Sequence, residues 1–143
     1  MKVIASLSFV ICSIFFVNCD ETKKVIDVAG TVQLSGTYTV IDLGQTVSIP
    51  EPMSFSFAVL DKSIKGYTGC NSFFGNYTID LLALSFGEFS VSERYCDQPV
   101  MASEMILLKT LQNTGSYSLQ NNVLTLYSKT DRHILLKANK TLN

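Results

Sequence analysis

The chain has 143 residues, of which 47% are hydrophobic and 16% charged, so its composition suits one compact domain and excludes a disordered or fibrous protein. Its 11 lysine and arginine residues nearly balance its 12 aspartate and glutamate residues. This balance provides no basic field to attract a polynucleotide, which argues against nucleic-acid binding. We therefore expect a single folded domain, and we expect it to be a monomer.

The amino terminus has the pattern of an export signal. Met1 and Lys2 give a short positive start, and an uncharged, mainly apolar run over residues 3–17 follows them. That order is typical of a secretory signal peptide. The run is shorter than the roughly 20 residues that a membrane-spanning helix needs. We predict a signal peptide over residues 1–18, with permanent membrane spanning as the weaker alternative.

A cysteine follows the apolar run. Residues 16–19, Phe-Val-Asn-Cys, resemble a loose bacterial lipobox, in which the cysteine receives lipid and becomes the first residue of the mature protein. We predict lipidation of Cys19, with residues 19–27 as attachment site and tether, and simple signal cleavage as the alternative. Two or three acyl chains hold a protein to a bilayer, because each buried methylene contributes about 0.8 kcal/mol. The predicted location is the cell envelope outside the cytoplasm, periplasmic or surface-facing, or the medium if the signal is only cleaved.

Two cysteines, Cys70 and Cys96, remain in the predicted folded part, residues 28–143. In an exported domain two cysteines predict one disulfide bond, and two buried free thiols are the alternative. A zinc site would need two further ligands, whereas the chain has one histidine, His133, and no CxxC spacing. We therefore expect no structural metal and no cofactor.

Short stretches of alternating polarity, separated by glycine, proline or asparagine, predict antiparallel strands along the folded part. Asn121 and Asn122 tolerate positive φ and predict a tight hairpin turn between two of these strands. In chain order, the predicted strands span residues 37–41, 53–59, 63–68, 73–79, 82–94, 117–119, 124–126 and 134–138.

One segment has helical periodicity instead. Met101, Met105, Leu108 and Leu111 recur at spacings of four, three and three residues, which places them on one helical face. We predict a helix at about 99–112 and expect its two methionines to pack in the core. Eight strands and one helix predict a mainly β (α+β) fold, in which a strongly twisted antiparallel sheet closes toward a barrel and the helix crosses one opening.

The densest group of special residues lies between positions 69 and 77. Gly69 and Gly75 allow positive φ or a close approach of the backbone, and Asn71 can hydrogen-bond the backbone of the loop. Together with Cys70 and Tyr77, these residues resemble the G-C-N-x-x-x-G-x-Y signature of the META domain (HslJ-like) family.

The resemblance to the META domain family covers roughly residues 33–137. The chain departs from the family pattern at Tyr38, where family members usually have tryptophan, and at Arg94 and Tyr95, where they have a methionine before the second cysteine. The resemblance implies an antiparallel, barrel-like fold exported to the envelope, with roles in stress or antibiotic tolerance. It implies no established catalytic residues.

We therefore predict a non-catalytic protein that binds or supports an envelope component, its partner being an unknown envelope protein or a hydrophobic ligand. A first alternative is a carrier of a hydrophobic ligand or lipid, which needs an apolar cavity of roughly 300 Å³ or more. A second is a small hydrolase with His133 as its base, although the acidic residues, Glu104 among them, are interpreted as solvated surface or cap positions. A third is a partner-binding module with an exposed aromatic patch from Phe73, Phe74 or Tyr95.

Overall fold

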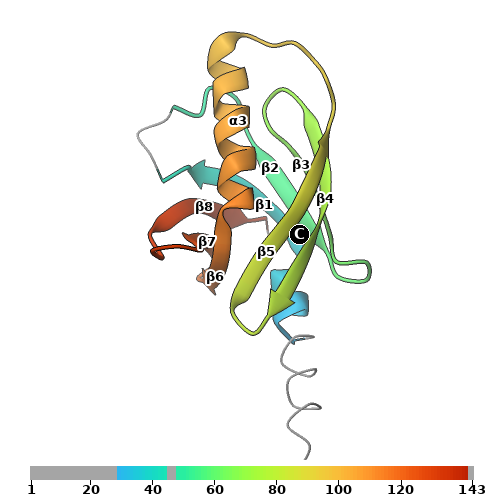
Figure 1. The fold of residues 1–143 in the computed structure, drawn as a ribbon, viewed down its shortest axis with the longest axis vertical. Helices are drawn as coiled ribbons and strands as arrows, with labels where there is room; N and C mark the ends of the chain where they lie inside the picture. The colour runs from blue at the N-terminus through green and yellow to red at the C-terminus, as the bar shows by residue number, and fades with distance from the viewer. Residues whose placement is uncertain (1–28, 45–47, 142–143) are drawn as a thin grey trace, which may run out of the picture.

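The computed structural model describes residues 29–44 and 48–141, which form an eight-stranded antiparallel barrel (Figure 1). Each strand pairs with the next along the chain, and the first strand closes the barrel against the last. This architecture confirms the predicted mainly β fold and the closure of its sheet. The predicted signal peptide over 1–18, the lipidation site Cys19 and the tether over 19–27 lie outside the described residues.

All the predicted strands are present, each within a few residues of its predicted bounds. In the fourth strand Phe73, Gly75, Tyr77 and Ile79 point inward and alternate with exposed residues, because successive side chains of a strand lie on opposite faces of the sheet. The strands are β1 (Gly36–Asp42), β2 (Ser54–Ala58), β3 (Ser63–Tyr67), β4 (Ser72–Asp80), β5 (Ala83–Val91), β6 (Thr114–Gln120), β7 (Val123–Ser128) and β8 (Ile134–Lys140).

Aromatic side chains fill the interior of the barrel. The ring of Phe57 meets the ring of Tyr77 edge-on with centroids 5.1 Å apart, and Tyr38 stacks on Phe55 at 5.7 Å. The buried hydroxyl of Tyr38 donates to the carbonyl of Leu34 at 2.9 Å. Removal from water, with a smaller effect of the nearby Tyr117, raises the pKa of Tyr38 to about 12. The interior is therefore a packed core whose buried phenol is paired.

The predicted helix is present as α3 (Gln98–Gln112), and it lies in the chain between β5 and β6. Because α3 occupies this connection, β5 and β6 share a single residue pair among the described residues, Ala83 with Ser116. The amide of Tyr117 also donates to the carbonyl of Leu82 at 3.2 Å. The barrel is therefore closed most narrowly between β5 and β6.

The face that α3 buries differs from the predicted one. Met105 is 70% exposed, so the expected packing of both methionines in the core is wrong. Small side chains on the buried face let the helix approach the barrel, and the hydroxyl of Ser103 is satisfied by the carbonyl of Val100 at 2.8 Å. The apolar spacing therefore predicted the wrong face of the helix, because the face that is buried includes polar residues. The buried residues of α3 are Ser103, Leu107, Thr110 and Leu111.

The barrel has two distinct ends, because successive turns of an antiparallel sheet alternate between them. A short helix over residues 29–34 precedes β1 and lies beside the turn between β4 and β5 (Figure 1). We call this the amino-terminal end; it comprises residues 29–35 and the turns at 59–62, 81–82 and 121–122. We call the opposite end the disulfide end; it includes the loops at 68–71 and 92–97. The turn at 129–133 lies beside the start of β5, since Lys129 and Arg132 line one depression together with Leu82 and Ala83.

Candidate functional site

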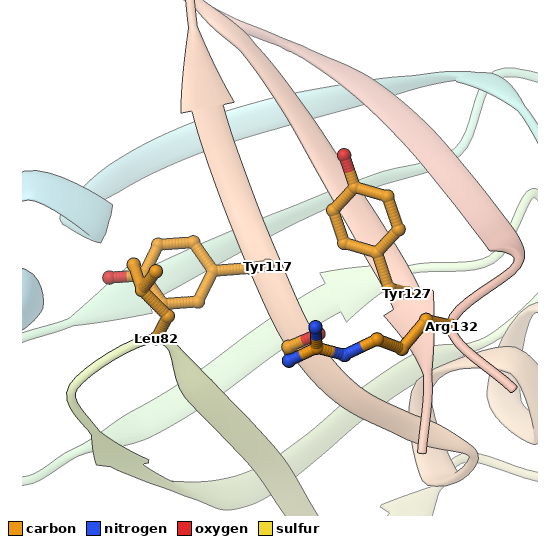
Figure 2. Close-up of a pocket in the computed structure, with 5 residues that line it drawn as sticks. Leu82, Tyr117, Tyr127 and Arg132 are labelled. Carbon is orange, nitrogen blue, oxygen red and sulfur yellow. The ribbon is translucent and has the colours of Figure 1, made fainter. Parts of the chain in front are cut away.

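Surface depressions lie where the turn between β4 and β5 meets β6. One of about 250 Å³ is lined by Leu82, Tyr117, Tyr127 and Arg132 together with Ser116, and Figure 2 shows Leu82 next to Tyr117. A larger apolar depression of about 570 Å³ lies beside it at the amino-terminal end. Both are open to solvent and lie outside the packed barrel interior. The residues lining the larger depression are Ala29, Gly30, Gln33, Leu81, Leu82 and Tyr117.

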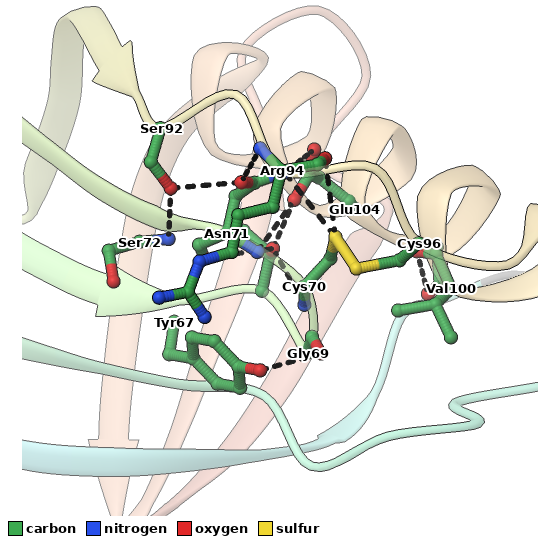
Figure 3. Close-up of a disulfide and its surroundings, with 12 residues drawn as sticks. Tyr67, Gly69, Cys70, Asn71, Ser72, Ser92, Arg94, Cys96, Val100 and Glu104 are labelled. Atoms are coloured by element: carbon green, nitrogen blue, oxygen red, sulfur yellow. Dashed lines mark hydrogen bonds between the residues drawn. A yellow bond between two sulfur atoms is a disulfide. The ribbon is translucent and has the colours of Figure 1, made fainter.

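The residues of the sequence motif gather at the disulfide end, where the loops at 68–71 and 92–97 meet the start of α3 (Figure 3). Cys70 and Cys96 are joined there by a disulfide bond, with their Cα atoms 6.0 Å apart. The predicted disulfide is therefore present, and the alternative of two free thiols is wrong. We call this cluster the disulfide corner; it consists of Thr68, Cys70, Asn71, Arg94, Cys96 and Glu104.

Asn71 connects the two loops of the disulfide corner. Its side chain is 3% exposed, and it pairs with the backbone of Arg94 as a neighbouring strand would. The Asn71 Oδ1 accepts from the Arg94 amide at 2.7 Å, and its Nδ2 donates to the Arg94 carbonyl at 3.2 Å. The hydroxyl of Ser92 also donates to Oδ1 at 2.9 Å. The expectation that Asn71 bonds the backbone is confirmed, and the bond reaches a second loop.

Glu104 brings α3 into the same network. Its carboxylate accepts from the Asn71 amide at 3.2 Å, from the Asn71 Nδ2 at 3.1 Å and from the hydroxyl of Thr68. All three donors are uncharged. The interpretation of Glu104 as a solvated residue is therefore wrong, because its partners lie on a loop more than 30 positions earlier in the chain. The position of Glu104 within the span that resembles the META domain family was an available signal.

We expect Glu104→Gln to lower the free energy of unfolding by about 1–3 kcal/mol, measured by urea denaturation. A glutamine keeps one acceptor but directs an NH₂ group at the Asn71 Nδ2, which is also a donor. Asn71 cannot turn over to correct this, because its Oδ1 is held by Arg94 and Ser92. Glu93→Gln, on the exposed part of the 92–97 loop, is the matched control. Equal stability of the two variants would contradict the proposed role of Glu104.

The two motif glycines serve different purposes. Gly69 has a φ of +93°, which side-chain-bearing residues rarely adopt, and a Cβ there would lie 2.9 Å from the Cβ of Glu51. Gly75 lies in β4, where a Cβ would come within 2.6 Å of the Phe89 ring. Tyr77, the last residue of the motif, lies in the barrel core and not at the corner. The motif therefore combines one loop glycine, the corner residues and two packing positions.

Two of the departures from the family pattern, Arg94 and Tyr95, lie in the 92–97 loop. Arg94 contributes its backbone N–H and C=O to Asn71, so these bonds do not depend on its side chain. Tyr95 is 83% exposed. Phe74 is also exposed, whereas Phe73 is buried in the core and cannot belong to the aromatic patch considered above.

His133 lies on the turn between β7 and β8, where its Nδ1 is 2.5 Å from the Oδ1 of Asp131. Both side chains are exposed. The cysteines of the described residues are joined in the disulfide, and the ring contact recorded for His133 there is with Asp131 alone. The structure therefore supplies His133 with an acid but brings it to no described nucleophile.

The bond from His133, followed by a bond from Ser128, lowers the pKa of Asp131 to about 2 from 3.8. Because the folded-state pKa is the lower one, this interaction contributes to stability above pH 3.8, and the contribution is lost as the pH falls through about 2. In an NMR titration of the carboxyl carbon, we expect His133→Ala to raise this pKa toward 3.8. An unchanged midpoint would show that another group lowers it.

Within residues 29–44 and 48–141, the helices lack the length and hydrophobicity that spanning a lipid bilayer requires. Likewise, no group of three or more potential metal ligands of the His, Cys, Asp or Glu type comes together in this part of the chain.

Several solved structures share this fold. An NMR structure of a protein from Burkholderia xenovorans has a TM-score of 0.66 at 18% identity, covering 81% of this chain and 89% of that one. A crystal structure of a DUF4847 family protein from Bacteroides vulgatus has a TM-score of 0.61 at 13% identity, covering 80% and 99%. A second NMR structure has a TM-score of 0.59 at 20% identity, covering 77% and 93%.

These similarities show a shared fold. No curated protein matches the chain. The META domain matches residues 31–141, a span that contains the whole barrel and the disulfide corner and extends slightly beyond the predicted resemblance. The chain therefore belongs to the META domain family.

Proposed function

We propose that this chain is an exported META-domain protein, anchored to a membrane through lipid on Cys19, that acts by binding an envelope component without catalysis. The disulfide corner is the observation that carries the proposal. A bond between Cys70 and Cys96 is stable in oxidising compartments and rare in the cytoplasm. It supports export, as does the signal-like sequence over residues 1–18.

Two features support binding without catalysis. The barrel interior is filled by packed side chains, which leaves the outer surface and the two ends for recognition. His133 is paired with Asp131 on an exposed turn, away from the corner that holds the family motif. The role in envelope stress tolerance follows from the family resemblance and is part of the same proposal.

The carrier alternative finds less support. A carrier encloses most of its ligand, whereas the largest described apolar depression is an open one outside the barrel. Tyr38, Phe55 and Phe57 occupy the place inside the barrel where a ligand would lie.

Mass spectrometry of the protein purified from membranes of a bacterial host tests the anchor. We expect the mature chain to begin at Cys19 and to carry the mass of acyl chains, and we expect it to partition into the detergent phase. Cys19→Ser is the matched control, because it removes the acylated thiol and leaves the barrel unchanged. An unmodified amino terminus at another residue would reject the lipid anchor.

A further inference from the structure

The amino-terminal end of the barrel carries exposed leucines. Among the described residues, the leucines with exposed side chains are Leu60 at 101%, Leu81 at 48% and Leu82 at 66%, and all three lie in turns at this end. Val32, on the short helix before β1, is 55% exposed and lies at the same end. Exposed leucines therefore occupy turns of a kind that polar residues usually form.

The turn between β4 and β5 has leucine at a position whose backbone conformation favours glycine or asparagine. Leu81 has a φ of 58°, a conformation in which leucine is uncommon and glycine or asparagine is preferred. The turn between β6 and β7, at the same end, is made by Asn121 and Asn122 with φ of 51° and 62°. The same chain therefore uses the ordinary turn residues at one hairpin and two leucines at the other. An exposed leucine pair, of which Leu81 has a strained backbone, indicates a contact outside the fold.

The chain also enters the barrel at this place. Ala29 and Gly30 line the same apolar depression as Leu81 and Leu82, and the Cβ position of Gly30 is 3.7 Å from the carbonyl oxygen of Leu81. Cys19 precedes Ala29 by ten residues, which span at most about 35 Å when fully extended. A lipid anchor on Cys19 would hold the turn between β4 and β5 within that distance of the bilayer.

We infer that the amino-terminal end docks on the lipid bilayer, with Leu81 and Leu82 inserted at the boundary between headgroups and acyl chains. This inference rests on the proposed anchor at Cys19. Apolar side chains that enter this boundary stabilise a peripheral contact, and the anchor makes a weak contact sufficient by keeping the surface close. The disulfide corner, at the other end, then points away from the membrane toward the envelope component.

A bilayer suits this surface better than a protein partner. Stable protein interfaces bury about 800 Å² on each partner, whereas this surface offers two adjacent leucines and a few separate apolar side chains. The charged residues Asp61, Lys62, Asp80 and Lys140 at this end balance each other. Lys129 and Arg132, from the turn between β7 and β8, also lie beside Leu82 and Ala83. Apolar contact flanked by two cations suits the headgroup boundary of a bilayer, where lipid phosphates lie.

The absence of tryptophan from the chain allows a direct test with single tryptophans. The full acylated protein, carrying either Leu82→Trp or Tyr95→Trp, is reconstituted into phosphatidylcholine vesicles with or without brominated acyl chains, which quench nearby tryptophan. Tyr95 is the matched control because it is exposed at the disulfide end. We expect brominated lipid to remove about half of the Leu82→Trp emission and to leave the Tyr95→Trp emission nearly unchanged.

Flotation of the vesicles separates this inference from the proposed anchor. Protein that floats with the vesicles but shows equal quenching at both tryptophans keeps the anchor and overturns the docking. Protein that does not float rejects both. Protein that floats with quenching confined to Leu82→Trp supports both.

A double replacement tests the contribution of the two leucines. Leu81→Gly with Leu82→Ser gives the turn residues that its backbone favours, so we expect the melting temperature to stay the same or to rise. With Val32→Trp as the reporter, the same double replacement should reduce quenching by brominated lipid at least about twofold. Undiminished quenching would show that the two leucines do not hold this end to the membrane, and would overturn the inference.

Discussion

Replacing both Cys70 and Cys96 by alanine is expected to lower the free energy of unfolding by about 3.5 kcal/mol. The two residues are 26 positions apart, so the disulfide closes a long loop and restricts the unfolded chain. Set against a typical stability of about 5–15 kcal/mol, the loss is a large fraction of the total. Urea denaturation of the mature protein, with and without the two replacements, measures it.

Reduction of the unaltered protein is the control for the alanine replacements. A reductant removes the same crosslink while keeping both side chains, so the two losses of unfolding free energy should agree to within about 1 kcal/mol. Thiol titration of the denatured protein before reduction should detect neither Cys70 nor Cys96. Two reactive thiols, or a loss below about 1 kcal/mol, would contradict the expected stabilisation.

The second large effect is expected at Asn71, where Asn71→Ala should cost about 2–4 kcal/mol. The replacement removes the partners of the backbone amide and carbonyl of Arg94 in a partly buried place, and it also removes the bonds to Ser92 and Glu104. A polar group left without a partner away from water costs more free energy than the net contribution of one hydrogen bond, because it has also lost its hydration.

Asn76→Ala is the matched control, since Asn76 is an exposed residue of β4 and its replacement should change the free energy by less than about 0.5 kcal/mol. Urea denaturation of both variants gives the comparison. We also expect Asn71→Ala to cost less once the disulfide is removed, because both features hold the same two loops together. Fully additive losses would mean that the amide and the crosslink stabilise the barrel independently.

Local patterns predicted the strands and the turns of this chain. The alternation in β4 placed Phe73 and Tyr77 inward, and the pair Asn121–Asn122 placed a hairpin turn. Such features depend on residues adjacent in the chain and on backbone preferences. Closure into a barrel followed from the number of strands and their antiparallel connections, without any need for helices to cover the sheet.

The orientation of α3 and the role of Glu104 could not be predicted in this way. The apolar spacing of Met101 and Met105 indicated one face, whereas the helix turns Leu107 and the small residue Ser103 toward the barrel. Glu104 meets Asn71 and Thr68 through contacts that cross more than 30 positions. Which face a helix buries depends on the surface it meets, and that surface exists only after the strands have paired.

The pairing between β5 and β6 is the weakest strand pairing of the barrel, because it consists of one residue pair among the described residues. A continuous curved sheet runs from β6 through β7, β8 and β1 to β5, and its two outermost strands meet through the pair Ala83–Ser116. Thermal opening should begin along this line, where few bonds have to break, and should leave the remaining strand pairs intact. The barrel would then open into a curved sheet along the β5–β6 pair. Because α3 connects these two strands, it would have to detach from the barrel for them to separate.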